Sequence, residues 1–437
     1  MKRANITVGL GFGDEGKGAT VDYLTRKFEA DLVVRYCGGS QAGHNVQLPD
    51  GRRHSFSQYG AGTLAELGDG RPRTYLGPHV IIDPLAMFRE AQHLTELGVP
   101  DPGRLLNIYP RCLVTTPWLK IVNQLRELAR GEARHGSCGQ GIGEARSYWL
   151  KYGEDAVFAA DLRELDALRH KLELQRQRAL LECQEVIQRI DDHVLQELDI
   201  WKLNTLDVAH ELSAAVPDGV MIDPVIPECR MAIFEGAQGV LLDEYRGFHP
   251  HTTWSTVTTH HAWELIHRMG VDAVAVLGVT RAYTTRHGEG PLPTYNAELT
   301  ARLRDAGNPW NRWQGNLRCG WLDLPLLRYA AAAAGPLDGI VVNHLDHLHD
   351  SECQICDAYR DTALSPAPAP NLGWQSRLTQ QLHVAEPVLS PATPEAILDL
   401  LSATAPVLVS STGPTHLERN SARIPFRLRR SLEKAAS

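Results

Sequence analysis

A glycine-rich loop between a predicted strand and a predicted helix is the feature that most constrains the fold of this 437-residue chain. Residues 5–10, NITVGL, have the continuous apolar character of a buried strand, and residues 18–29 have helical spacing. In a loop such as GFGDEGKG (11–18), backbone N–H groups and the helix N-terminus face a bound anion, and Lys17 adds positive charge. A tight turn without a ligand is the alternative, but the strand, the helix and the lysine together favour a phosphate site.

The loop departs from the common phosphate-binding pattern G-x-x-x-x-G-K-[ST] at its last position. Both glycines and the lysine match, but Gly18 stands where a Ser or Thr hydroxyl would hold magnesium. Asp14 and Glu15 lie inside the loop, where acidic groups repel phosphate unless a cation lies between them. We therefore expect Asp14 either to supply the metal ligand that Gly18 lacks or to act as a base beside the phosphates.

Strand-like and helical segments alternate along the chain, which indicates an α/β fold. Several strand-like segments are continuous runs of Val, Ile and Leu, as expected of parallel strands buried on both faces. We predict a large, mostly parallel central sheet flanked by helices, similar to P-loop NTPases. The predicted strands are 5–10, 30–36, 73–77, 231–237, 272–283, 337–345 and 405–412, and the predicted helices are 18–29, 84–97, 161–200, 259–268 and 323–334. The polar range 161–200 is expected to form two helices outside the sheet, at a subunit contact.

Composition narrows the class of protein. Hydrophobic residues make up 43% and charged residues 22% of the chain, and the formal net charge is -8. This balance is typical of a soluble globular protein and argues against nucleic acid as the main partner. No apolar run approaches the ~18 residues of a membrane span, and the N-terminus does not resemble a signal peptide. We expect a cytoplasmic protein with reduced thiols, in which Cys353 and Cys356 are strand cysteines rather than zinc ligands.

Three further loops carry candidate functional residues. His44 lies on a glycine-framed loop after the second predicted strand, where it is a credible acid or hydrogen-bond donor. Gln238 stands between two glycines after another strand, and hydroxyls of Thr252, Thr253 and Ser255 follow where they could bind phosphate. His249 and His251 lack the partners of a metal site at suitable spacing, so we discount them as ligands.

A possible guanine-binding sequence follows the strand predicted at 337–345. Asn343, His344 and Asp346 match the pattern N/T-K-x-D except that His344 replaces the lysine. The aspartate of this pattern accepts hydrogen bonds from two N–H groups on one edge of guanine, which adenine cannot offer. Residues 407–416, VLVSSTGPTH, could close over the base.

In this order the motifs resemble those of the adenylosuccinate synthetase family, from residue 5 to about 415. The matching stretches are GFGDEGKG, GGSQAGHNV, GSCGQGIGEA, FEGAQGVLLD, RAYTTRHGEGPLPT, RCGWLD, NHLD and SSTGP. The resemblance implies one α/β domain over residues 1–437, GTP as co-substrate, Mg²⁺, small-molecule substrates and a homodimer without nucleic-acid or membrane partners. It also implies a reaction that joins IMP and aspartate.

The resemblance assigns roles to the matching residues. Asp14 takes the N1 proton of the purine, the C6 oxygen attacks the γ-phosphate, His44 acts as general acid, Lys17 neutralises charge and Gln238 holds the purine. An amine then displaces the phosphate at C6. Asp14 and the carbonyl of Gly43 are the expected Mg²⁺ ligands. The expected nucleotide contacts are Gly13, Glu15, Gly16, Gly18, Asn343, His344, Asp346, Ser411, Thr412 and Gly413.

Some positions depart from the family pattern in the regions expected to bind the other substrates. The expected contacts there are Gln41, Ala42, Cys138, Thr253, Arg312 and Arg318. Gln41 replaces an asparagine, and Cys138 replaces a threonine that binds the 5′-phosphate. The family's arginine-rich clamp for the aspartate carboxylates becomes NRWQGNLRCGW (311–321), where two arginines stand among aromatic and apolar residues.

The sequence therefore leaves the substrates open. The first hypothesis is a divergent adenylosuccinate synthetase with local compensation. The alternative is a relative in specialised metabolism that uses GTP to activate a different oxo substrate or takes a different amine. A non-catalytic GTP-binding protein is the third possibility, but a mere binder has no need of His44. The sequence does not name the amine donor or the residue that crosses a dimer interface.

Overall fold

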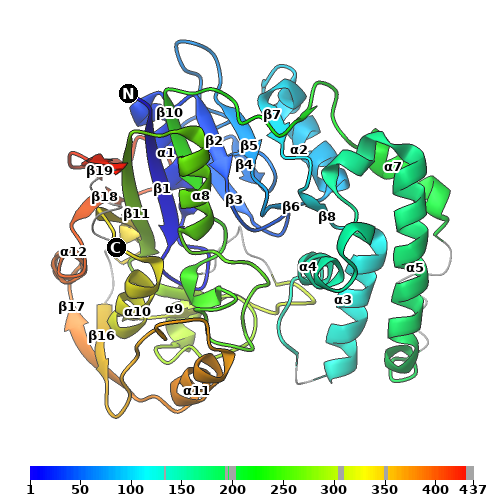
Figure 1. Ribbon diagram of the computed structural model, residues 1–437. Coiled ribbons are helices and arrows are strands. Elements are labelled where there is room, and N and C mark those ends of the chain that lie inside the picture. The colour runs from blue at the N-terminus through cyan, green and yellow to red at the C-terminus, as the bar shows by residue number, and fades with distance from the viewer. Residues whose placement is uncertain (132–133, 192–194, 196–202, 304–309, 349–352, 430–437) are drawn as a thin grey trace.

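The computed structural model describes residues 1–131, 134–191, 195, 203–303, 310–348 and 353–429 (Figure 1). Its centre is an eleven-stranded sheet with the order β19-β18-β15-β11-β1-β10-β2-β5-β7-β9, and β20 pairs with β11. All neighbouring pairs are parallel except β18–β19 and β11–β20. The strands are β1 (Arg3–Gly9), β2 (Leu32–Arg35), β5 (Arg73–Leu76), β7 (Leu106–Ile108), β9 (Met221–Ile222), β10 (Met231–Glu235), β11 (Ala273–Arg281), β15 (Gly339–Asn343), β18 (Val407–Ser411), β19 (Arg419–Ser421) and β20 (Arg427–Leu428).

Alternate residues of the central strands pack into different cores on the two faces of the sheet. On β2, Leu32 and Val34 join the core that includes the apolar side of helix α8 (His260–Met269), whereas Val33 joins the core that includes helix α1 (Lys17–Phe28). Both faces are thus buried, which explains why these strands are continuous apolar runs in the sequence.

Helices surround the sheet and extend beyond one end of it. Helices α3, α4, α5 and α7 gather at the right of Figure 1, where α5 packs against α3 and α7. Their bounds and those of the other helices are α2 (Pro84–Glu96), α3 (Pro117–Arg130), α4 (Ile142–Tyr152), α5 (Leu165–Ile187), α7 (Thr205–Ala214), α9 (Ala297–Arg302), α10 (Leu324–Ala334), α11 (Leu372–His383) and α12 (Pro394–Ser402).

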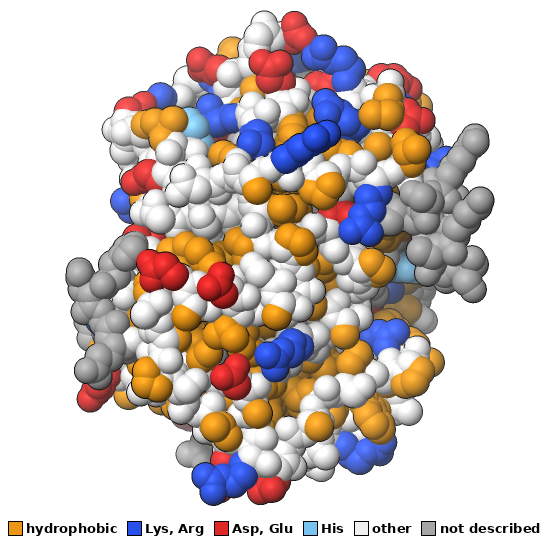
Figure 2. Space-filling view, turned by 90° about the vertical axis from the view of Figure 1, so that its left-hand side faces the viewer, with side chains coloured by type: hydrophobic (Ala, Val, Ile, Leu, Met, Phe, Trp, Pro, Cys, Tyr) orange, Lys and Arg blue, Asp and Glu red, His pale blue; other side chains and the backbone are white. Residues whose placement is uncertain are grey.

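Small sheets carry the remaining strands of the described part. They pair β3 (His44–Gln47) with β4 (Arg53–Phe56), β6 (Ile81–Ile82) with β8 (Leu113–Val114), and β12 (Thr284–Arg286) with β13 (Arg318–Gly320), and they order β14 (Leu322–Asp323), β16 (Cys353–Tyr359) and β17 (Pro387–Ala392) as β14-β16-β17. Figure 2 looks on to the side that lies at the left of Figure 1 and shows hydrophobic side chains interspersed with both signs of charge.

The structure confirms the predicted α/β class. Each of the seven predicted strands is in the central sheet, and the helices predicted near 18–29, 84–97, 259–268 and 323–334 form within two residues of those bounds. Helix α5 fills much of the range 161–200 and lies away from the sheet (Figure 1). The second helix expected in that range falls largely outside the described residues, and the subunit contact stays a prediction. No helix of the described segments is both long enough and apolar enough to cross a bilayer.

The structure also places the cysteine pair as predicted. Cys353 and Cys356 both lie on β16 with buried thiols, which contact the carbonyls of Leu348 and Ala358. The eight cysteines are free thiols.

Candidate active site

The predicted functional loops meet at one edge of the sheet because each follows the carboxyl end of a parallel strand. The glycine loop follows β1, the His44 loop follows β2, and the Gln238 loop follows β10, which lies between those two strands. On the other side of β1 come β11, β15 and β18, whose ends carry Arg281, Asn343 and Ser411. Strand order alone therefore brings segments from both halves of the chain together.

The glycine loop makes the expected turn from β1 into α1. Gly16 caps the helix in a left-handed conformation, with φ of 86°, and no side chain caps the helix N-terminus. The first N–H groups of α1 are thus left for a ligand, as in other anion-binding helix termini. Asp14 also has a left-handed backbone, with φ of 61°, and its carbonyl accepts a close hydrogen bond from the Nε–H of Arg281. This contact fixes the loop from the neighbouring strand β11.

Glu15 turns inward rather than toward the position of a phosphate. Its Oε1 accepts a hydrogen bond from the N–H of Gly13 at 2.8 Å, and its Oε2 forms a close ion pair with the Nζ of Lys17. Both side chains are buried, at 3% and 4% exposure. The acidic residue therefore balances the lysine inside the loop, so its carboxylate does not oppose a phosphate. The contact of Glu15 with the nucleotide stays a prediction, and in this structure its carboxylate is engaged by Gly13 and Lys17.

Gly18 is a glycine because the His44 loop lies against it. A Cβ atom at Gly18 would come within 2.7 Å of the carbonyl carbon of His44 and 2.9 Å of the oxygen of Asn45. Real Cβ atoms essentially never come that close to other atoms. A Ser or Thr at this position, as in an ordinary phosphate loop, would push the His44 backbone away. The departure from the common pattern is thus the feature that brings His44 to the first turn of the phosphate-binding helix.

His44 is held by a buried carboxylate that sequence reasoning missed. Its Nδ1 makes a close contact with Oε1 of Glu235, the last residue of β10, and Oε2 of Glu235 accepts the N–H of Ala61 at 3.0 Å. Glu235 is fully buried and His44 is 6% exposed. Because Nδ1 is engaged, Nε2 is the nitrogen left to face a substrate.

A buried arginine completes this arrangement. Arg35 at the end of β2 is the register partner of Glu235 and is 1% exposed. Burial alone would raise the pKa of Glu235, but the charges of Arg35 and His44 bring that pKa below its ordinary value. Burial lowers the pKa of His44, and the Glu235 carboxylate opposes that shift. The carboxylate therefore stays ionised and offsets part of the shift, while the pKa of His44 stays below its ordinary value.

Gln238 offers an amide oxygen to the site. Its backbone is left-handed, with φ of 49°, and its side chain lies beside Gly38 at the start of the His44 loop. The buried Oε1 of Gln238 has no hydrogen-bond partner among the described residues. A buried polar atom of this kind calls for a partner outside the chain, and a purine edge fits that need.

The predicted guanine-binding residues divide into two roles. The Nδ2 of Asn343 donates to the carbonyl of Glu15 at 2.7 Å and to Oγ1 of Thr20 at 3.2 Å. Arg419 on β19 donates to Oδ1 of Asn343 at 2.8 Å. Asn343 thus ties the end of β15 to the phosphate loop, so its side chain positions the loop. Arg419 was missed because nothing local in its sequence marks it.

Asp346 is the residue with the geometry expected for base recognition. It lies in a short 3₁₀ turn (Leu345–Leu348) directly after β15, and its buried Oδ1 has no partner within the described part of the chain. Its other oxygen lies 3.6 Å from Nε2 of His347. His344 has a left-handed backbone, and burial together with the charge of Arg281 holds its pKa well below the ordinary value. A neutral His344 beside Asp346 leaves the carboxylate free to accept two N–H groups.

The loop after β18 closes on itself. Ser411 donates to the carbonyl of Gly413 at 2.7 Å, and the N–H of Thr412 donates to the carbonyl of Glu418 at 3.0 Å. Glu418 also accepts two hydrogen bonds from Thr415, at 2.9 and 2.8 Å. Because β18 pairs with β15, this preformed loop stands next to the Asp346 turn.

The residues expected at the 5′-phosphate surround the N-terminus of α4. Gln41 packs back on Gly39, which also touches Ile142 of α4, and Oε1 of Gln41 is buried with no partner in the described ranges. Cys138 lies in the loop that leads into α4, and burial raises the pKa of its thiol. Ala42, which follows Gln41 in the His44 loop, is buried. Thr253 is held by a 2.7 Å hydrogen bond from its N–H to Leu242, next to Trp254, which contacts Gly143 of α4.

The two arginines of the altered amine-donor segment are already occupied. Arg318 donates to the carbonyls of Gly288 and Gly290 at 2.6 and 3.0 Å, and the Arg312 guanidinium lies 5.5 Å from the centre of the Trp313 ring. Trp313 in turn packs on Gly139. The structure thus joins this segment to the Cys138 loop. It also shows that Arg318 braces its own loop, so a carboxylate substrate would have to compete with two carbonyl groups.

The loops that contain Asp14 and Gly43 offer hard oxygen donors to a divalent cation. Asp14 is a half-buried residue of the glycine loop, and Gly43 is exposed with open space where a side chain would be. Carboxylate and carbonyl oxygens with room for water suit Mg²⁺. The donor chemistry therefore fits the predicted ion.

Comparisons with known proteins agree with this geometry. A family model described as adenylosuccinate synthetase matches residues 6–385. The adenylosuccinate synthetase of Clostridium botulinum (strain Alaska E43 / Type E3) is 33% identical over 364 residues, which cover 82% of this chain and 81% of that protein. The adenylosuccinate synthetase of Halothermothrix orenii is 34% identical over 365 residues, covering 81% and 80%.

Solved structures show the same fold. A fully ligated adenylosuccinate synthetase from Plasmodium falciparum matches with a TM-score of 0.75 and 20% identity, over 96% of this chain and 99% of that one. The succinoaminodeoxyadenylate synthetase of cyanophage S-2L, bound to dGMP and to dATP as an energy donor, matches with a TM-score of 0.59 and 17% identity, over 99% and 98%. The predicted family resemblance and fold are confirmed.

Proposed function

The chain belongs to the adenylosuccinate synthetase family of C–N bond-forming ligases, and we propose that it activates the 6-oxo group of an IMP-like purine with GTP and replaces it with an amine. The contact of Gly18 with His44 carries this proposal. This contact places the imidazole of His44, which is held by the Glu235 carboxylate, against the first turn of the phosphate-binding helix. A protein that only bound GTP would not need an imidazole there. The nearest known reaction is the joining of IMP and L-aspartate.

The activation of the purine uses residues from the loops at this edge of the sheet. Asp14 takes the N1 proton of the purine, and the C6 oxygen attacks the γ-phosphorus of GTP, so that the bond from this phosphorus to the bridging oxygen of GDP breaks. Nε2 of protonated His44 donates to the phosphate, while Glu235 stabilises the imidazolium through Nδ1. Gln238 contacts the purine through its side-chain amide, whose buried oxygen has no partner among the described residues. An amine then attacks C6, and inorganic phosphate leaves with the original C6 oxygen.

Charge on the phosphates is met by fixed groups. The N–H groups of the α1 N-terminus face the anion, which is the positioning and electrostatic work that phosphoryl transfer needs, and Lys17 adds its charge by turning from its ion pair with Glu15 toward the phosphates. Mg²⁺, held by Asp14 and the Gly43 carbonyl, would supply further neutralisation of phosphate charge. Asp346 favours the binding of GTP over ATP, because its buried Oδ1, which has no partner in the described residues, can accept the N–H groups of guanine.

The amine donor is where this chain differs most from the family pattern. The Arg318 guanidinium is engaged by two carbonyls, and Arg312 lies over Trp313. A dicarboxylate would therefore meet fewer free cationic forks than in the family pattern, and each lost charged hydrogen bond costs about 1.5–3 kcal/mol. These contacts support the second candidate, a ligase of the same mechanism with a different amine donor or oxo substrate.

Further properties follow the family. We propose one domain over residues 1–437, because the central sheet takes strands from both ends of the chain, β1 and β19. We also propose a homodimer that works in the cytoplasm on small-molecule substrates, without nucleic-acid or membrane partners. Analytical ultracentrifugation at several protein concentrations tests the dimer.

A substrate panel tests the function. Phosphate release and product mass are measured with GTP or ATP, with IMP or dGMP, and with L-aspartate or other amines. Turnover that needs GTP, IMP and L-aspartate together supports adenylosuccinate synthesis. Turnover only with another acceptor or amine supports the second candidate. Tight GTP binding without ligation under any combination contradicts both.

A further inference from the structure

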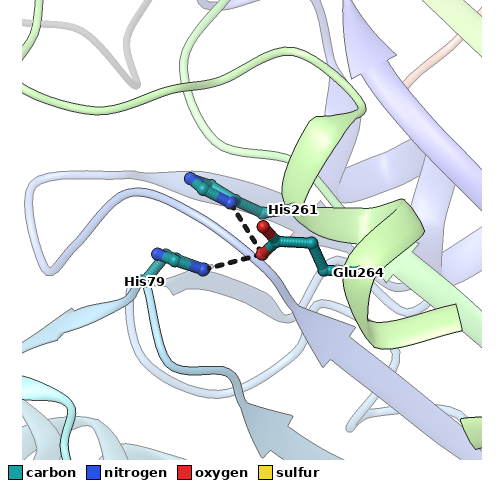
Figure 3. A group of neighbouring side chains, drawn as sticks. All are labelled: His79, His261 and Glu264. Atoms are coloured by element: carbon teal, nitrogen blue, oxygen red, sulfur yellow. Dashed lines mark hydrogen bonds and ion pairs between the residues drawn. The ribbon is translucent and has the colours of Figure 1, made fainter. Parts of the chain in front are cut away.

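Two histidines and a glutamate converge outside the residues assigned to the reaction (Figure 3). His79 lies in the loop after β5, and His261 and Glu264 lie in the first turns of α8. The Nε2 of His79 and the Nδ1 of His261 lie 2.9 and 3.1 Å from the same carboxylate oxygen, Oε2 of Glu264. The two imidazole rings stack with their centres 3.4 Å apart and their planes 11° apart.

The spacing of these three atoms suits a metal ion. Ligand atoms about 2.0–2.1 Å from a tetrahedral Zn²⁺ stand about 3.3 Å from one another. The two nitrogen–oxygen separations of 2.9 and 3.1 Å are close to that edge length, and all three ligand atoms lie within 4.8 Å of one another. For both nitrogen lone pairs to meet one ion, the stacked imidazole planes must turn toward each other, and the partial exposure of Glu264 (46%) and His79 (31%) leaves room for that movement.

We propose that His79, His261 and Glu264 bind a divalent transition-metal ion of the Zn²⁺ class. Two imidazoles and one carboxylate are donors that such ions prefer, whereas Mg²⁺ prefers the oxygen donors of the Asp14 loop. The site is distinct from the magnesium site in both residues and chemistry, so it does not depend on the function proposed above.

Neighbouring groups support the arrangement. The Nε2 of His260 lies 3.4 Å from Oε1 of Glu264, the oxygen that does not face the other two histidines. Such an outer partner orients a ligating carboxylate. His79 and His261 also line a cavity with Arg146, Glu244 and Ser255, which gives room for water as a fourth ligand.

The ion would link two elements that are far apart in sequence. His79 belongs to the segment between β5 and β6, and the other two ligands belong to the helix that covers one face of the sheet. Bound metal would therefore fix the N-terminal end of α8 to that loop. A rise in the melting temperature on metal addition is a second expected signature.

Metal titration tests the proposal. The full chain is stripped with a chelator and kept in excess Mg²⁺, and Co²⁺ is added, followed by Zn²⁺. We expect one tightly bound ion per chain, a visible absorption band of tetrahedral Co²⁺ that Zn²⁺ abolishes, and an X-ray absorption spectrum of the Zn²⁺ form with two imidazole ligands.

Variants locate the ion. His79→Ala, His261→Ala and Glu264→Gln should lose the Co²⁺ band, with folding checked by circular dichroism. His210→Ala, which removes an exposed histidine on α7, should keep it, as should His347→Ala, which disrupts the other potential cluster of His344, Asp346 and His347. Absence of stoichiometric binding by the wild-type chain, retention of the band in His79→Ala and His261→Ala, or its loss in His347→Ala would overturn the proposal.

Discussion

Restoring the usual phosphate-loop hydroxyl by Gly18→Ser should impair the enzyme rather than improve it. A Cβ at this position stands 2.7 Å from the carbonyl carbon of His44, and ordinary contact begins at 3.4 Å. The His44 backbone must therefore move by about 0.7 Å. A displacement of about 1 Å in a catalytic group costs on the order of 100-fold in rate, so we expect kcat to fall by about 10- to 100-fold. Overpacking should also lower the free energy of unfolding by about 1–3 kcal/mol.

The assay is phosphate release with GTP, IMP and L-aspartate, or with the best substrates from the panel above, together with denaturant unfolding. Gly68→Ala is the matched control, because a Cβ there meets nothing within 4 Å and should leave kcat unchanged. The KM for GTP should change less than kcat in Gly18→Ser, because Lys17 and the loop N–H groups remain. If Gly18→Ser keeps or raises kcat, the steric explanation for this glycine is wrong.

Three other changes probe separate parts of the structure. Glu235→Gln should lower kcat by about 10- to 100-fold and move the loss of activity at rising pH to lower pH, because His44 loses the carboxylate that favours its protonated form; an unchanged pH profile would remove Glu235 from this role. Asp346→Asn should raise the KM for GTP by about 10- to 100-fold, as expected for about 1.5–3 kcal/mol of charged hydrogen bonding, with the KM for IMP as the internal control; an unchanged GTP preference would contradict base recognition by this residue. Burial raises the pKa of Asp323 to about 7, so the folded chain keeps a proton that the unfolded chain releases above about pH 4. The free energy of unfolding should therefore fall between about pH 4 and pH 7 and then level off. Asp323→Asn removes this penalty and should gain up to roughly 4 kcal/mol on the wild type between pH 4 and 8, as measured by denaturant unfolding; parallel pH dependences would refute the assignment.

The central strands could be predicted because parallel strands buried on both faces leave a strong local signal. Val33 and Val34 of β2 pack on opposite faces of the sheet, and both must be apolar. The short strands β7 and β9, which end one side of the sheet, carry no such run and were not predicted, and neither were α3 and α4. Helix α3 begins at Pro117 after a short strand, and its Asn123 and Gln124 donate hydrogen bonds to Ser137 and Gly139 of the Cys138 loop, contacts that are made only in the fold.

The site shows a similar division. Asp14, Lys17 and His44 could be found because they stand in glycine-rich loops at strand ends. Glu235 also stands at a strand end, before Gly236, but it is fully buried, and nothing local shows that His44 and Arg35 will meet it there. The sequence also did not show why residue 18 is a glycine, because the cause is a close contact with the backbone of His44, 26 residues further along the chain. Long-range contacts of this kind depend on the strand order, which local patterns do not determine.

Oxygen transfer from the purine tests the proposed chemistry most directly. The substrate is IMP labelled with ¹⁸O at C6, or the alternative oxo substrate if the panel selects one, and the released phosphate is analysed by mass spectrometry after one turnover with GTP and the amine. We expect one ¹⁸O atom in the inorganic phosphate, because the C6 oxygen attacks the γ-phosphate and leaves with it. Unlabelled phosphate from a reaction that still forms the C–N bond would contradict activation of the 6-oxo group at this site.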